Sequence, residues 1–560
     1  MSELTRITLS QAGIKAGTLQ RFLEEEYRSG VEVHSFMLIW GGKVAAEGWA
    51  APYGREKRHP VFSFSKTLTA AAVGFAVQEG LLSLDEKLTD LFPEYCPPAP
   101  SENLKKADIR SLLTMSCGHR SELTMSEVSR FGGNWIAAFL AHPFDYEPGT
   151  VFQYNTWGSD LLSAAIQKKT GMTLTQYLTD RLQAPLGMNP LICSGRHLGD
   201  SFTSKVEGGG WGMHLTTEDM GRFIWFLRQN GQWEGRQLLD ADWVRQMTDR
   251  QIETDNPVYR PFDSNWKKGY GWQRWMCDPE GIVRADGAFG QFGIIMPKED
   301  ADLVLTAATL NTEADLNCVW DILLPALQGD QTETGGEEAA GCGNSAGETA
   351  KSPARSLERL LSGWHVPEIW GVRAPKLERE YDGVRFQADT PGCPSMEDFI
   401  AGEGYQGPDG LAVRAVTFRF PQDAREAELH IELCRKADVD TDIYGIRDPF
   451  SPAGRKIPKG NEHLICHDGD ASETVTQVLK IGLDGRSRLS RLTRYEFTAS
   501  GRWVNPGTFE MLIRNTECVS AAHVRATFFR GMLTLEAESQ LPEESGLTHR
   551  ATTGMHFTEG

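Results

Sequence analysis

The chain has 560 residues, more than a single hydrophobic core usually supports, so we expect at least two domains. Hydrophobic residues at 40% and charged residues at 24% are typical of globular proteins and argue against a disordered chain. A formal net charge of -19 would repel nucleic-acid phosphates and anionic lipid headgroups. The expected partner is therefore a small molecule or a peptide, with no nucleic acid and no membrane.

The first residues, MSELTRITLSQAGIKAG, lack the basic and apolar segments of a signal peptide, and the sequence has no long uninterrupted apolar stretch. We therefore expect a cytoplasmic protein. The 10 cysteines stand singly, without a C-x-x-C pair, which favours buried reduced thiols over a zinc or redox site. No metal or cofactor is expected.

The N-terminal part of the chain alternates between strand-like and helical patterns. A helix is expected over residues 19–27, followed by a β-hairpin that pairs the apolar runs 35–40 and 44–49. From Ser63 onward, SFSKTLTAAAVGFAVQEGLL places apolar residues at helical spacing, and further helical patterns occupy 109–115, 157–169 and 217–229. Strand-like runs return at 269–276, 281–284, 292–296 and 303–307, before a last helix over 317–327. The pattern predicts an α/β (α+β) domain with one antiparallel sheet plus a helical subdomain.

The clearest boundary follows this domain, in the segment GDQTETGGEEAAGCGNSAGETAKSP, which has almost nothing to bury. After it, apolar and polar residues alternate along several runs, as in Glu428 to Leu433. Such alternation predicts a β-rich region, either a sandwich or a barrel. The predicted organisation is a first domain over residues 1–328, a linker over 329–353 and a β-rich C-terminal domain over 354–560.

Ser63 and Lys66 form an S-x-x-K motif at the start of the first long helix. Three residues apart on a helix, the two side chains lie on the same face. A serine hydroxyl needs a neighbouring base to become a nucleophile, and a buried lysine can act as one. The motif is recorded for the nucleophile of β-lactamases and penicillin-binding proteins. Ser264 and Lys267 repeat the spacing but precede a strand-like run, so we interpret that copy as chance.

Several segments, in a fixed order, surround Ser63 and Lys66: GLLSLDEKLTDLFPEY, ADIRSLLTMSCGH, EPGTVFQYNTWGSDLLSAAIQKKTGMTL, PLGM, GGGWGMHLTTEDMGRF and ADGAFGQFGIIMPKEDADLVL. With them the chain resembles the class C β-lactamase and penicillin-binding-protein-like serine hydrolase family. The resemblance implies the serine β-lactamase-like fold and acyl transfer without a metal.

The resemblance also implies the remaining site residues. Tyr154 matches the tyrosine of the family's Y-x-N motif, which shares the proton transfer with Lys66, and either of the two could be the general base. Thr156 replaces the usual Asn as a substrate-binding residue; it keeps a hydroxyl but lacks an amide.

The family's K-T-G triplet corresponds here to Ala285-Asp286-Gly287, so the cation that commonly holds a substrate carboxylate is missing. Gly287 would still line the substrate site, and the backbone N–H groups of Ser63 and Ala288 would form the oxyanion hole. Arg284 could place a charge nearby, although we expect a solvated arginine at a strand edge.

These features predict a serine hydrolase that cleaves ester or amide bonds through an acyl-enzyme on Ser63. The alternative is a ligand sensor with little or no catalysis on a penicillin-recognising scaffold, since the Asn and the K-T-G cation are missing. Some D-aminopeptidase-like relatives carry β-barrel domains after the same catalytic domain, so the C-terminal region could gate substrates or pack; binding of a sugar or lipid is the competing idea.

Two other motifs are rejected on their context. Gly343 to Gly347 matches G-x-S-x-G, the nucleophile elbow of α/β-hydrolases, but lies in the predicted linker without a preceding strand. His463 and His467 lack the further ligands of a metal site, and we interpret them as surface histidines.

Overall fold

A computed structural model describes most of the chain, which divides into two compact units, Met1–Trp364 and His365–Gly560. The described residues are 4–197, 199–259, 264–329, 353–369, 374–388, 411–421, 425–435, 475–484, 486–492, 495–516, 521–539 and 552–559. Each unit is a separate body with its own hydrophobic core.

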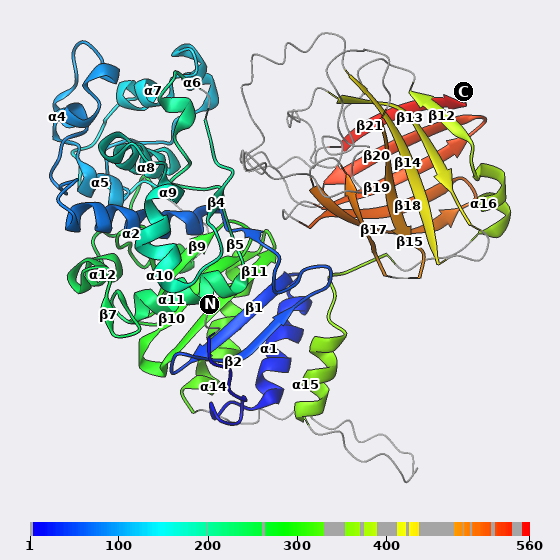
Figure 1. Ribbon diagram of the computed structural model, residues 1–560, viewed down its shortest axis with the longest axis horizontal. Helices are drawn as coiled ribbons and strands as arrows, with labels where there is room; N and C mark the ends of the chain where they lie inside the picture. Colours follow the sequence, from blue (N-terminus) through cyan, green and yellow to red (C-terminus); the bar gives the residue numbers. More distant parts are fainter. Residues whose placement is uncertain are drawn as a thin grey trace. The chain divides into compact units, whose positions relative to one another are not determined.

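The first unit is built on an antiparallel sheet of six strands in the order β2-β1-β11-β10-β9-β8 (Figure 1). Their bounds are β1 Glu32–Trp40, β2 Lys43–Trp49, β8 Trp275–Met276, β9 Val283–Gly287, β10 Gln291–Met296 and β11 Ala301–Ala308. Strands β1 and β2 form the predicted hairpin, and β11 inserts beside β1. The sheet therefore joins the first and last strands of the unit, as the sequence pattern predicted.

Both faces of this sheet are buried, and the alternation along β1 shows how. Phe36 and Leu38 belong to one core, whereas Met37 and Ile39 belong to the other. The first core lies under helix α1 (Ala16–Arg28) and the helical segment α13 (Thr312–Cys318), η7 (Val319–Leu323) and α14 (Leu324–Leu327). The second lies under α11 (Thr217–Arg228) and α2 (Ser65–Gln78). The unit thus has a helix–sheet–helix arrangement.

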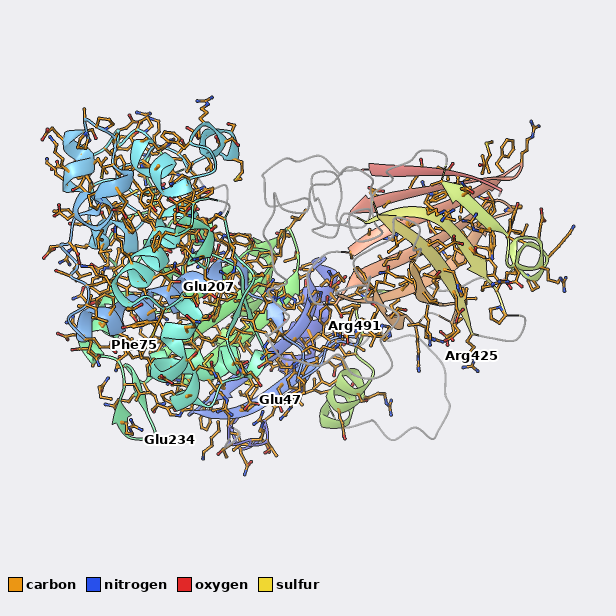
Figure 2. All side chains as sticks on the ribbon, turned by 45° about the horizontal axis from the view of Figure 1, so that its top comes forward. Glu47, Phe75, Glu207, Glu234, Arg425 and Arg491 are labelled. Carbon is orange, nitrogen blue, oxygen red and sulfur yellow. The ribbon has the colours of Figure 1, made fainter. Side chains whose placement is uncertain are left out.

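The helical subdomain packs around α2 and α8 (Thr156–Thr170), which contact each other (Figure 1) and bury most of their residues. Phe75 on α2, labelled in Figure 2, is 3% exposed. The other helices around them are α3 Leu88–Leu91, α4 Glu102–Lys106, α5 Ile109–Leu113, α6 Met125–Arg130, α7 Trp135–Ala141, α9 Leu174–Leu178, α10 Ala184–Leu186 and α12 Ala241–Thr248. Short strands β3 His59–Pro60, β4 Ile192–Cys193 and β5 Met213–Leu215 form a small sheet, and β6 Gln232–Trp233 pairs with β7 Arg236–Gln237.

The strand predicted over residues 269–276 is wrong except at its end. Gln273 has a positive φ of 57°, and the Gly271 N–H donates to the Arg274 carbonyl within the run. This local turn breaks the extended pattern, so only β8 joins the sheet. Aromatic residues in this run pack into a small core instead of alternating across a sheet.

The C-terminal boundary of the first unit lies later than the sequence predicted. Helix α15 (Pro353–Ser362), which the sequence assigned to the second domain, packs against α1. Leu357 on this helix is buried in the core beneath the sheet, and Trp364 after it contacts Phe36 with ring centroids 5.9 Å apart. In the sequence, the second unit therefore begins at His365 instead of residue 354.

The second unit contains a barrel-like sheet of ten strands, which settles the choice between sandwich and barrel. The order is β15-β14-β13-β12-β21-β20-β19-β18-β17-β16, and β15, at one end of this order, also pairs with β17, the strand before the other end. The elements are α16 Pro375–Tyr381, β12 Arg385–Ala388, β13 Leu411–Arg419, β14 Glu426–Arg435, β15 Val475–Gly482, β16 Arg488–Leu492, β17 Tyr495–Asn505, β18 Thr508–Asn515, β19 Ala521–Phe529, β20 Met532–Ser539 and β21 Thr552–Glu559. Aromatic side chains including Phe418, Trp503, Phe509 and Phe528 fill its core.

Two expected features fall outside the described residues. They are residues 330–352 of the predicted linker over 329–353, with Gly343 to Gly347, and the pair His463 and His467.

Five free cysteines are described, of which four are buried and Cys96 is half-buried. Among the helices that the structure describes, none combines the length and the apolar character needed to span a membrane.

Candidate active site

Ser63 lies at the joint between a short strand and a helix, as the sequence predicted. It is the middle residue of the 3-10 helix η1 (Phe62–Phe64), which leads directly into α2. The preceding Phe62 has a positive φ of 45°, which is uncommon for a bulky side chain and indicates a strained turn. Its ring packs edge-on against Phe289, another residue with positive φ, at 5.1 Å between centroids. Two strained aromatic residues thus contact each other beside the nucleophile.

Lys66 points its ammonium group at Ser63, as expected for S-x-x-K in a helix. The Lys66 Nζ lies 2.9 Å from Ser63 Oγ, 3.3 Å from Thr156 Oγ1 and 2.8 Å from the Gly210 carbonyl oxygen. The side chain is 1% exposed, so these oxygens replace water around the nitrogen. A neutral amine fits the same contacts, because Ser63 can then donate its proton to the nitrogen while Gly210 still accepts.

Tyr154 is half-buried on the other side of Lys66, whose Nζ is 4.8 Å from the centre of the tyrosine ring. The ring stacks on Trp275 at 5.7 Å between centroids. Burial raises the pKa of Tyr154 well above its usual range; Tyr270 and Asp286 add to the rise, and a hydrogen bond with Ser63 opposes it. Tyr154 is therefore a neutral phenol in the resting site, suited to pass a proton on.

Thr156 begins helix α8, and its side chain serves Lys66. Its hydroxyl accepts from Lys66 Nζ at 3.3 Å, and its backbone N–H donates to Glu122. Asn155 caps the helix by accepting from the Gly158 N–H at 3.2 Å. Thr156, which stands where the family's motif has Asn, thus forms a hydrogen bond with the lysine.

The predicted Ala285-Asp286-Gly287 triplet lies on β9, directly beside the nucleophile turn. A Cβ atom on Gly287 would lie 2.2 Å from the Val61 carbonyl oxygen and 3.2 Å from the Phe64 nitrogen, so only glycine fits there. This close approach brings the turn after β9, which begins with Ala288, next to the segment that carries Ser63.

The expectation that Arg284 is a solvated strand-edge residue is wrong. Its side chain has no exposed surface, and its Nε donates to Asp286 Oδ2 at 2.8 Å. The guanidinium also lies over the rings of Trp266 and Trp275, at 4.8 and 5.9 Å. Burial raises the pKa of Asp286, and the ion pair with Arg284 opposes that rise. A buried arginine needs such a partner, and here Asp286 provides it.

The second S-x-x-K copy is not a catalytic arrangement. Ser264 begins a 3-10 helix of three residues, Ser264–Trp266, and no α-helix follows to place Lys267 one turn above it. The interpretation of this copy as chance is consistent with that local structure.

Sequence reasoning missed three interactions at the site: that of Gly210 with Lys66, that of Arg284 with Asp286, and that of Glu122 with Thr156. The Gly210 carbonyl reaches Lys66 from 144 residues away, and only the run of three glycines signalled a close backbone approach. Arg284 and Asp286 are two apart on one strand and so share a face, a signal that predicts their pairing. Glu122 carries no recognisable signal.

Comparison with known proteins shows the family to which this chain belongs. A model of the beta-lactamase family matches residues 18–321, more than half of the chain, so the protein belongs to the beta-lactamase family of serine hydrolases.

Individual relatives are distant. The chain is 23% identical over 291 residues to the 6-aminohexanoate-dimer hydrolase of Paenarthrobacter ureafaciens, which covers 48% of this chain and 71% of that protein. It is 27% identical over 286 residues to protein flp of Staphylococcus aureus (strain MW2), covering 46% of this chain and 53% of that one. Among solved structures, the octameric penicillin-binding protein homologue from Pyrococcus abyssi matches with 14% identity and a TM-score of 0.43, over 97% of this chain and 99% of that chain.

Proposed function

We propose that this protein hydrolyses ester or amide bonds of small or peptide-like substrates through an acyl-enzyme on Ser63. The observation that carries the proposal is the 2.9 Å contact between Lys66 Nζ and Ser63 Oγ at a buried lysine. A nucleophile and a base within hydrogen-bond reach, with the base oriented by further groups, is the arrangement that covalent catalysis requires.

In the first step, Ser63 Oγ bonds to the substrate's acyl carbon while its proton passes to the leaving group. Lys66 and Tyr154 carry that proton, since both contact Ser63. Lys66 can accept it directly as a neutral amine, whereas Tyr154, a neutral phenol, can take it only while passing its own proton on. The bond to the alcohol or amine breaks as the protonated product leaves. Water then attacks the acyl group, and Ser63 regains its proton through the same pair. Splitting the reaction in this way replaces one difficult step by two easier ones.

The negative charge that develops on the substrate oxygen needs donors fixed in advance. We assign this role to the backbone N–H groups of Ser63 and Ala288. Support comes from the close approach of Gly287 to Val61 and Phe64, which sets the two segments side by side. Main-chain donors do not depend on side-chain identity, so the loss of the K-T-G lysine leaves them in place.

We expect neutral substrates to be preferred over those with a carboxylate near the scissile bond. The position of the family's cation holds Ala285, and the neighbouring Arg284 is engaged by an ion pair with Asp286. The hydroxyl of Thr156 is engaged by Lys66, and Thr156 has no side-chain amide with which to bind a substrate amide. Esters should therefore be hydrolysed more readily than β-lactams.

The test compares Ser63→Ala with the wild type on a short-chain nitrophenyl ester, and uses Ser264→Ala as the matched control. We expect the first change to lower kcat/KM by several orders of magnitude, because the covalent nucleophile is lost, and the second to leave it unchanged. Labelling with a fluorophosphonate separates the alternative. A protein labelled at Ser63 that turns over no ester or amide would be a sensor instead of an enzyme.

A further inference from the structure

Asp160, a residue that the site described above does not include, lies one turn along α8 from Thr156, and its side chain is 1% exposed. Its Oδ1 accepts from the Gly210 N–H at 2.7 Å, and its Oδ2 lies 2.6 Å from His197 Nε2. We propose that Asp160 is a positioning residue for Lys66, acting through Gly210; the proposal rests on the function proposed above.

The link to the lysine runs through a single residue. Gly210 gives its N–H to Asp160 and its carbonyl oxygen to Lys66 Nζ, at 2.7 and 2.8 Å. Because both bonds belong to one residue, fixing its N–H restricts where its carbonyl points. A carbonyl can only accept a hydrogen bond, so it holds a Lys66 N–H and leaves the rest of the nitrogen to face Ser63.

The fit of the glycine segment against α8 supports this reading. A Cβ atom on Gly209 would lie 2.2 Å from the Ser159 carbonyl oxygen, and one on Gly210 would lie 2.7 Å from Thr156 Cγ2. The segment therefore rests directly on the first turns of the helix. Asp160 binds the glycine segment at this position. The same helix supplies Thr156, whose hydroxyl oxygen is also bonded to Lys66.

His197 holds the far side of Asp160. Its ring stacks on Trp157 at 4.4 Å between centroids, so its own position is set by the helix. With one oxygen on His197 and the other on Gly210, the Asp160 carboxyl group has little freedom to rotate. The group is thus held rigid without touching Ser63, as expected of a residue that orients a catalytic side chain.

The experiment measures kcat and KM on a neutral nitrophenyl ester for Asp160→Ala and Asp160→Asn. Asn keeps an oxygen for the Gly210 N–H, whereas Ala does not. We expect Asp160→Ala to lower kcat by about a hundredfold with little change in KM, since a misplaced catalytic group affects the chemical step most. Asp160→Asn should restore most of kcat. Asp219, another buried and hydrogen-bonded carboxyl group, provides matched Asn and Ala controls.

Gly210→Ala is the second variant, used if Asp160→Ala does not fold. It leaves Asp160 unchanged but displaces the glycine segment from Thr156, because the added Cβ would clash there. It should lower kcat in the same way, whereas Gly17→Ala, with open space at its Cβ, should not. Wild-type kcat in Asp160→Ala, or in Gly210→Ala where Asp160→Ala does not fold, would overturn the proposal. So would equal losses in Asp160→Asn and Asp160→Ala. If Ser63→Ala retained wild-type turnover, the proposed function would fail as well, and the two failures are thereby distinguished.

Discussion

The buried pair of Arg284 and Asp286 makes a prediction about substrate charge. A carboxylate that docks near β9 would lose water without finding a cation, because Arg284 has no exposed surface and is bound to Asp286 at 2.8 Å. Leaving a desolvated polar group without a partner costs about 1–3 kcal/mol, which corresponds to roughly 5- to 150-fold in kcat/KM. Repulsion by Asp286 itself adds little, since the ion pair cancels most of its charge.

The assay compares two nitrophenyl esters of similar length, the butyrate and the hemisuccinate, which differ in a terminal carboxylate. We expect the neutral ester to have the higher kcat/KM by the factor above, and a chromogenic cephalosporin to be a poor substrate. A clear preference for the hemisuccinate or the cephalosporin would refute the reasoning.

Asp286→Asn gives a sharper form of this test. The variant releases the charge of Arg284, so the preference for the neutral ester should narrow or reverse. Breaking a buried pair costs about 3–5 kcal/mol, so folding is checked by thermal denaturation first. Glu280→Gln is the matched control. It removes a charge from an exposed residue shortly before β9, so the preference for the neutral ester should stay unchanged. An unchanged preference in Asp286→Asn would show that the pair does not govern substrate charge.

Three further predictions concern the site and the stability of the chain. Lys66→Ala and Tyr154→Phe should each lower kcat by about a hundredfold, and the double variant should lose less than the product of the two, because they share one proton path; a loss equal to the product would contradict that path. A fragment ending at residue 364 should be more soluble than one ending at residue 340, since the shorter fragment lacks α15 and exposes the core that Leu357 covers. Size-exclusion chromatography compares the aggregation of the two fragments. Equal aggregation would mean that α15 is not needed to cover this core. Burial raises the pKa of both Glu26 and Asp315, two buried carboxyl groups that share a hydrogen bond and have no cationic partner among the groups that shift them. The folded state therefore holds more protons than the unfolded one above pH about 4, and the free energy of unfolding should fall as pH rises from there. Asp315→Asn should flatten that slope in denaturant titrations, while Asp219→Asn should not.

The sequence predicted those parts of the site that depend on local spacing. Ser63 and Lys66 are three residues apart on a helix, so their contact follows from helix geometry alone. The hairpin of β1 and β2 followed from two neighbouring apolar runs, and the strands of the second unit from the alternation of apolar and polar residues. Tyr154 and Thr156 came from family resemblance, and the structure brings both to Lys66.

What the sequence could not show depends on long-range packing. The run of three glycines indicates a close backbone approach, but no local pattern identifies Lys66, 144 residues away, as the partner of the Gly210 carbonyl. Gln273 adopts a positive φ that its residue type does not signal, so the apolar pattern around it predicts a strand that does not form. A charged side chain predicts exposure, and Arg284 is buried instead because Asp286, two residues along the strand, pairs with it.

The central claim is that Ser63 carries the acyl group during turnover. Intact-mass spectrometry of the full chain, quenched during reaction with a slowly deacylated ester, tests it directly. We expect an adduct of the acyl mass that peptide mapping assigns to Ser63, and the complete loss of this adduct in Ser63→Ala. An adduct that persists in that variant, or one mapped to Ser264 or Ser345, would contradict it.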